Sequence, residues 1–151
     1  MKSNLLHAHL TTQFNGVAPE RLYEIYVDAD EHQRATGQPA AIDAREGGAF
    51  SAYGGYLSGT FIRLQPGRLV VQFWHSKHFN DTDPDAILSI AFRKNEYEQA
   101  ETELVLTNVP DGMTRHDNSS WNQFYWEPFR GYLAGTSKPA DFAGALAQTR
   151  R

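Results

Sequence analysis

The chain's most distinctive hydrophobic pattern lies near its C-terminus, at residues 121–133. This stretch holds six of the nineteen aromatic residues. Its apolar side chains fall at steps of three and four, which on a helix gives one broad apolar stripe. The stripe consists of Trp121, Phe124, Tyr125, Pro128, Phe129 and Tyr132. Because so wide a stripe needs a large apolar surface to cover it, we predict that the preceding chain forms a curved sheet holding this helix.

The pattern before this helix predicts one strand, then two helices, then a run of strands. Residues 6–14 alternate loosely and predict the first strand. A helix should begin at Pro19, because proline suits a first turn, and end near Val27 or Asp28. A second short helix is predicted at 30–36, ending at Gly37. Further strands are predicted at 41–45, 49–53, 56–64, 69–75, 86–94 and 102–109.

Glycine residues indicate where the predicted strands turn or bend. The pair Gly54 and Gly55 predicts a tight type I′ hairpin, because both central positions of that turn need positive φ. Gly59, inside a predicted strand, indicates a bulge or a bend.

The ends and the middle of the C-terminal helix also carry signals. We expect Asn118, Ser119 or Ser120 to cap its start and Gly135 to end it. Pro128 removes a backbone hydrogen bond inside the helix, so the helix should kink there and bend over the sheet.

The order of elements places the chain in the α+β class. Consecutive hairpins imply an antiparallel sheet, with the pairing of the first strand left open. We predict six to seven strands curved around the C-terminal helix, with two short helices after the first strand. Residues 1–136 are expected to form a single domain and 137–151 a loose C-terminal tail, in which Phe142 and Leu146 dock.

Composition narrows the function classes. The 151 residues carry 14 Lys and Arg against 18 Asp and Glu, a net charge of −4 that argues against a nucleic-acid surface. The absence of cysteine rules out disulfides and cysteine zinc sites. No stretch approaches the roughly 18 apolar residues of a membrane span, and the first residues lack a signal-peptide pattern. We therefore expect a cytoplasmic protein without a membrane partner.

Candidate chemistry is sparse. His75 and His78 are three residues apart and should point to opposite faces of a strand. His7 and His9 should share a face, but two ligands are too few for a metal. The alternating aspartates of 81–85 lack the glycine and distant glutamate of a calcium loop. We expect no metal and no cofactor, and no catalytic residue can be named.

A set of short motifs gives the chain a family resemblance over about residues 10–135. Its pieces are Phe14, 19–23, 36–40, Glu46-Gly47-Gly48-Ala49-Phe50, Tyr53-Gly54-Gly55, Gly59, 66–70, Phe73-Trp74, 102–104, 109–110 and 121–133. In this order they resemble the family of activators of the heat-shock protein 90 ATPase, within the START-like, helix-grip (SRPBCC) superfamily. The chain departs from it at His75, where relatives usually carry Arg, at Asn108 and at Ser120.

The resemblance implies a ligand pocket, because superfamily members bind ligands between the sheet and the long helix. Here the pocket residues would be Phe61, Trp74, Leu88, Ile90, Trp121, Tyr125 and Phe129. Tyr and Trp offer an apolar body with one polar group, which suits an amphipathic ligand. Two alternatives stay open: these aromatics simply fill the space, or Phe73 rather than Trp74 faces inward. We choose Trp74 on the resemblance.

The leading hypothesis is a small soluble, non-enzymatic protein that binds a small apolar or amphipathic molecule in this pocket. One alternative is a co-chaperone-like interaction module or stress-response protein. A chaperone partner is not favoured, because the eukaryotic co-chaperones carry a separate N-terminal domain for which 151 residues leave no room. A second alternative is a pocket enzyme of the cyclase or hydrolase type. A homodimer stays open without a patch to identify its interface.

Overall fold

The computed structural model describes residues 7–135. The predicted tail at 137–151, with Phe142 and Leu146, lies outside these residues, so the single domain at 1–136 stays a prediction. The N-terminal elements are β1 (Ala8–Phe14), α1 (Pro19–Val27), α2 (Ala29–Thr36), β2 (Ala41–Ile42), β3 (Ala49–Ala52) and the short turn η1 (Tyr53–Gly55). The remaining elements are β4 (Leu57–Gln65), β5 (Leu69–Ser76), β6 (Ala86–Lys94), β7 (Ala100–Thr107), α3 (Asn118–Trp121), the π-helical turn η2 (Asn122–Trp126) and α4 (Glu127–Leu133).

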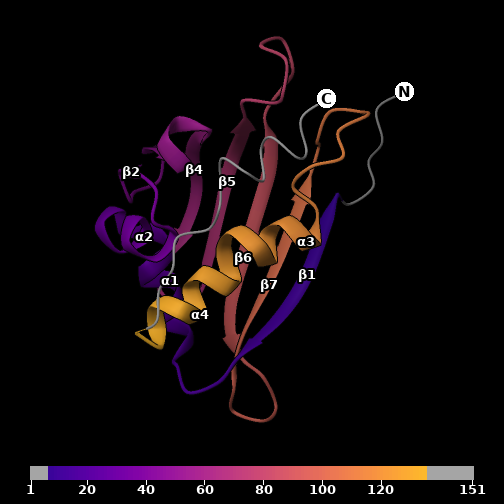
Figure 1. Cartoon of the computed structure of the whole chain (residues 1–151). Coiled ribbons are helices and arrows are strands. Elements are labelled where there is room, and N and C mark those ends of the chain that lie inside the picture. The colour runs from indigo at the N-terminus through magenta and orange to yellow at the C-terminus, as the bar shows by residue number, and fades with distance from the viewer. Residues whose placement is uncertain (1–6, 136–151) are drawn as a thin grey trace.

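The strands form one seven-stranded antiparallel sheet in the order β1-β7-β6-β5-β4-β3-β2. The first strand, whose pairing the sequence left open, lies antiparallel to β7. Figure 1 shows α3 and α4 crossing one face of this sheet, with α1 and α2 beside α4. The α+β helix-grip architecture predicted from the sequence is confirmed.

The core lies between the sheet and the helices. Strand residues alternate between buried and more exposed positions, most regularly in β7, and the buried set faces the helices. Trp74 is 1% exposed whereas Phe73 is 43% exposed, so the choice of Trp74 as the inward residue is confirmed. This alternation follows from the period of two in a strand.

The elements α3, η2 and α4 follow one another without a break, and together we call them the C-terminal rod. Asp117 caps the start of this rod, in place of the predicted Asn118, Ser119 or Ser120. Its carboxylate accepts a hydrogen bond of 3.0 Å from the Ser120 N–H. Asn118 is occupied elsewhere: its amide donates to the carbonyl of His9 and accepts from the His9 N–H, both at 3.0 Å. The side chain of Asn118 is therefore engaged with β1 and does not cap the helix.

The rod is interrupted on the N-terminal side of Pro128, where η2 replaces α-helical geometry. Pro128 then lies in the first turn of α4, where a missing N–H has no intrahelical partner. In a regular helix the Phe124 carbonyl would accept from residue 128. Here the hydroxyl of Tyr53 donates to that carbonyl instead, so a residue of η1 takes over a contact that proline cannot make.

Two glycine-based predictions are corrected. Gly54 and Gly55 both have positive φ, as predicted, but Tyr53 does too, and the closing pair is Ala52 with Leu57. The connection is therefore a four-residue loop and not a two-residue type I′ turn. Of the bulge or bend predicted at Gly59, the bulge is wrong.

The register shift in β4 lies further along, between Phe61 and Arg63. Gly59 instead marks a close approach of two backbones. A Cβ at that position would collide with the carbonyl oxygen of Phe73, and the ring of Phe50 would lie 3.0 Å away. Only glycine fits this position without a shift of its neighbours.

Most strands differ from their predicted bounds by one or two residues, and two of the differences are informative. The strand predicted at 41–45 is only Ala41–Ile42. β7 begins at Ala100 and ends at Thr107, because Asn108 adopts a positive φ of 63° that leaves the extended conformation.

Candidate functional site

All seven predicted pocket residues lie at the boundary between sheet and helices, and each is at most 3% exposed. Four of them form a continuous series of ring contacts. Trp74 lies 5.9 Å from Trp121, which stacks on Tyr125 at 4.8 Å, and Tyr125 lies 6.0 Å from Phe129 (ring centroids). These rings come from β5, α3, η2 and α4, so the Trp74–Trp121 contact joins the sheet to the C-terminal helical segment and the other two contacts lie within that segment.

The other three predicted residues contribute differently. Leu88 and Ile90 are fully buried on β6. Phe61 packs against Phe50 at 5.6 Å between ring centroids, so its ring contact is with β3. A role for the seven residues in ligand binding stays a prediction.

A buried polar network that sequence reasoning missed crosses this interior. The Tyr26 hydroxyl donates to Oε1 of Gln72 at 2.7 Å. His32 Nδ1 lies 2.8 Å from the Tyr26 carbonyl, which can only accept, so Nδ1 carries the proton. The Tyr125 hydroxyl then donates to His32 Nε2 at 3.1 Å.

Burial is the main cause that lowers the pKa of His32, to about 4. The imidazole is therefore neutral near pH 7, as the hydrogen bonds require. The missed signal was positional: His32, Ala35 and Thr36 have the i, i+3, i+4 spacing of a buried helix face, and all three are buried.

Three buried polar atoms in the same interior have no hydrogen-bond partner among residues 7–135. They are the indole Nε1 atoms of Trp121 and Trp126 and the hydroxyl of Thr102. Leaving such a group unpaired costs about 1–3 kcal/mol. An acceptor reaching either indole would recover part of that cost.

A second polar cluster lies where β5 meets the linker that precedes α3. His116, at a positive φ of 67°, has its Nε2 2.9 Å from the Ser76 hydroxyl and its ring 4.9 Å from that of Trp74. Burial, followed by the nearby charges of His78, His7 and Arg115, lowers the pKa of His116 to about 3.

The neutral imidazole of His116 and the Ser76 hydroxyl share one hydrogen bond. The sequence alone suggested no nucleophile–base pair. Ser76 and His116 are of the residue types that form such a pair in some enzymes. However, Ser76 is 0% exposed, so a substrate has no access to the hydroxyl. We interpret the pair as a link between β5 and the linker.

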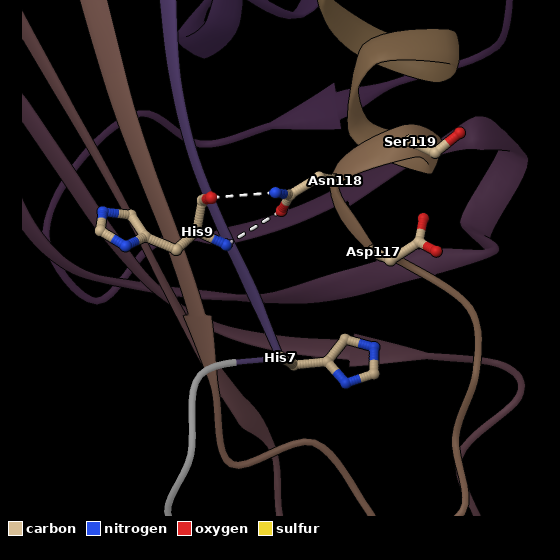
Figure 2. A pocket seen from close by; sticks show the side chains of 5 residues that line it. All are labelled: His7, His9, Asp117, Asn118 and Ser119. Carbon is tan, nitrogen blue, oxygen red and sulfur yellow. Dashed lines mark hydrogen bonds between the residues drawn. The ribbon is translucent and has the colours of Figure 1, made fainter.

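An open depression of about 410 Å³ lies beside β1 and the start of the rod, lined by His7, His9, Asp117, Asn118 and Ser119. Figure 2 shows the imidazoles of His7 and His9 pointing to opposite sides of the strand. His7 reaches the Arg115 carbonyl at 2.6 Å, and His9 reaches Glu103 at 2.8 Å. The prediction that they share a face is wrong, because His7 lies in a bend before β1 begins.

Residues 7–135 contain no group of three His, Asp or Glu side chains placed to hold a metal ion. Within the same range, no helix has both the length and the apolar character needed to cross a membrane.

Comparison with known proteins decides the family. The sequence model of the family described as "Activator of Hsp90 ATPase homolog 1-like protein" matches residues 16–134. The chain belongs to this family.

Curated members of the activator family are similar over most of this chain. Activator of 90 kDa heat shock protein ATPase homolog 2 of Mus musculus is 26% identical over 132 residues, 87% of this chain and 39% of that protein. Homolog 1 of Homo sapiens is 29% identical over 112 residues, 73% of this chain and 32% of that protein. The chain thus spans about a third to two-fifths of the length of these relatives.

Solved structures agree on the fold. The crystal structure of an HSP90 activator from Plasmodium falciparum has a TM-score of 0.73 at 22% identity and covers 83% of this chain and 94% of its own. The Aha1 dimer from Colwellia psychrerythraea has a TM-score of 0.70 at 14% identity and covers 87% and 98%. At these identities the likeness establishes the shared architecture of the activator family.

Proposed function

We propose that this chain is an accessory module that binds a 90-kDa heat-shock protein and stimulates its ATPase. The observation that carries the proposal is the family match over residues 16–134. The curated relatives similar to this stretch are named as activators of that ATPase. This ranking reverses the sequence-based one, which placed a small-molecule role first.

The packing of the interior is consistent with a module that acts through its surface. The rings that were expected to line a pocket contact one another directly, and the buried hydroxyls of Tyr26 and Tyr125 are satisfied by Gln72 and His32. A ligand at this position would have to displace these contacts. A protein partner needs no such rearrangement.

The experiment is a titration of the chain into the 90-kDa heat-shock protein of the same organism. Isothermal calorimetry reports binding and phosphate release reports turnover, with an ATP-competitive inhibitor to subtract background. We expect a dissociation constant of roughly micromolar order and at least about a twofold rise in turnover. The chain covers only part of its relatives, so binding and stimulation are scored separately.

A matched control is Gly59→Val, which leaves the charge unchanged but places a side chain against the Phe73 backbone. It should show neither binding nor stimulation, because the sheet cannot form normally. Absence of binding by the folded wild-type chain at about 100 µM would remove the proposal.

A small amphipathic ligand is the second candidate, favoured by the unpaired indole groups of Trp121 and Trp126. A ligand with an acceptor group would sit among the seven predicted pocket residues and accept from an indole N–H. Native mass spectrometry of the purified chain should then show added mass. Trp121→Phe keeps an aromatic ring but loses the donor, and should lower ligand occupancy, whereas Thr102→Val serves as a nearly isosteric comparison. No added mass, and no thermal shift with a panel of amphipathic compounds, would argue against this candidate.

A further inference from the structure

Large apolar side chains gather on the face of the sheet that the helices leave uncovered. Among residues 7–135, three of the four exposed large hydrophobics lie on β4, β5 and β6: Ile62 at 39%, Phe73 at 43% and Ile87 at 39% exposure. Phe73 and Ile87 are paired directly across β5 and β6. We call the outward positions of β4 to β7 the outer face.

The outward side chains next to this pair are short. Thr60 pairs with Phe73 from β4, and Ser89 follows Ile87 two positions along β6. Val71, opposite Ser89, is the next outward residue of β5 and is half-buried. An apolar centre on a sheet is suited to packing against another sheet face, with outward side chains from the two faces interdigitating at about 10 Å separation.

A second copy of this chain meets that requirement by symmetry. A two-fold axis parallel to the strands and between β5 and β6 places β5 over β6 of the second copy, and β4 over its β7. Phe73 of each copy then lies over Ile87 of the other, because the two residues are at the same level along the strands. A contact of this kind is isologous, so one favourable pairing occurs twice.

Charge is complementary in the same arrangement. Arg63, on β4, is exposed and forms no ion pair within residues 7–135. It is level with Val71, Ser89 and Val105, which are successive partners across β5, β6 and β7. Over β7 of the second copy it would lie within two residues of Glu103, whose side chain is 35% exposed and also pairs with Arg93 at 2.9 Å and His9 at 2.8 Å within its own chain.

The size of the face sets the strength of the contact. Four strands about 4.8 Å apart and about eight residues long cover roughly 500 Å². Two copies would bury roughly 1,000 Å² in total, the lower limit for a specific interface. Association should therefore be weak, with a dissociation constant of roughly tens to hundreds of micromolar.

We infer that the outer face, centred on Phe73 and Ile87, is the contact surface of a weak two-fold homodimer of this chain. The inference is independent of chaperone binding, because it concerns the isolated chain. Sedimentation velocity from about 10 µM to 1 mM should show the weight-average sedimentation coefficient rising with concentration.

Variants locate the interface. Phe73→Ser should weaken association at least about tenfold. Tyr97→Ser, which removes an aromatic ring 70% exposed in the connection after β6, should leave association unchanged. Both sites are solvent-exposed, so circular dichroism should report an intact fold.

A charge exchange tests the orientation. Arg63→Glu should weaken association about fivefold, and adding Glu103→Arg to it should restore most of the loss. A wild-type chain that remains monomeric at 1 mM would overturn the inference, as would association that Phe73→Ser leaves unchanged. If the exchange fails while Phe73→Ser weakens association, the two-fold axis parallel to the strands is wrong. None of these outcomes decides the ATPase titration, which measures binding to the heat-shock protein and its turnover.

Discussion

Acidification should destabilise this protein well above the pH at which carboxylates protonate. His32 lies in the interior, 2% exposed, and its pKa is lowered from 6.5 to about 4, chiefly by burial. Above pH 6.5 the imidazole is neutral in both the folded and the unfolded chain, so its full contribution is present. As the pH falls, the unfolded chain takes up the proton first, and the free energy of unfolding decreases until the folded state also protonates near pH 4.

The size of the effect follows from the shift. Each pH unit within this window costs about 1.4 kcal/mol, so His32 should remove roughly 3 kcal/mol by pH 4. His116 acts in the same direction, with its pKa lowered from 6.5 to about 3 by burial and then by His78, His7 and Arg115. Because the side chain of His116 keeps some exposure to solvent, we assign the larger part of the decrease in the free energy of unfolding to His32. A typical domain has about 5–15 kcal/mol in total, so the loss is substantial.

The buried histidines and the carboxylates with lowered pKa values affect stability in different pH ranges. Arg21 is the main cause that lowers the pKa of Glu31 below its ordinary 4.5, and His9 is the main cause for Glu103. These groups therefore lose their contribution only below about pH 4.5. Between pH 6.5 and 4.5 the decline should follow His32 and His116.

Urea titrations at pH 7.5, 6.5, 5.5 and 4.5 measure the decline. Fluorescence is a direct probe, because all three tryptophans are at most 3% exposed in the folded state. His32→Gln should be less stable at pH 7.5, since it loses the two hydrogen bonds, but its stability should fall less steeply toward pH 4.5. His9→Gln, at an exposed position, provides the comparison. A slope in His32→Gln equal to that of the wild type would refute the reasoning.

Three further substitutions test local features. Gly59→Ala should lower the free energy of unfolding by about 2–4 kcal/mol, because a Cβ collides with the carbonyl of Phe73; a thermal midpoint within about 2 °C of wild type would contradict this. Tyr53→Phe should cost about 1 kcal/mol, and less in a Pro128→Ala background that supplies an N–H; a double-mutant cycle in urea with no coupling would count against the shared carbonyl. Asp117→Ala should cost about 1 kcal/mol through the lost cap and Asp117→Asn much less, so equal losses in chemical denaturation would exclude capping as the cause.

The sequence was informative where a regular period extended over many residues. The apolar stripe at 121–133 predicted a helix and the need for a sheet to receive it, because burial of one helix face is a property of the whole segment. The hairpin strands followed for the same reason. Even the inward position of Trp74, which alternation alone left open, came from the resemblance and not from the local pattern.

Single-residue roles depended on contacts distant in sequence. Asn118 and Asp117 are equally good caps by composition, and only the contact of Asn118 with β1 decides between them. His32 gave no chemical motif, since its partners Tyr26 and Tyr125 come from α1 and η2. The bulge after Phe61 likewise needed the register of β5, which a single strand does not contain.

The amide of Asn118 has a consequence for how copies of this chain meet. It forms hydrogen bonds with the N–H and C=O of His9 at the edge of the sheet. Further along the same strand, Arg130 donates to the Gln13 carbonyl at 2.7 Å. β1 is one border of the sheet, and the other border, β2, is only two residues long. Among residues 7–135, neither border therefore offers a run of free backbone groups on which a foreign strand can add. Fibre-like growth by strand addition is discouraged at both ends, and self-recognition is left to side chains.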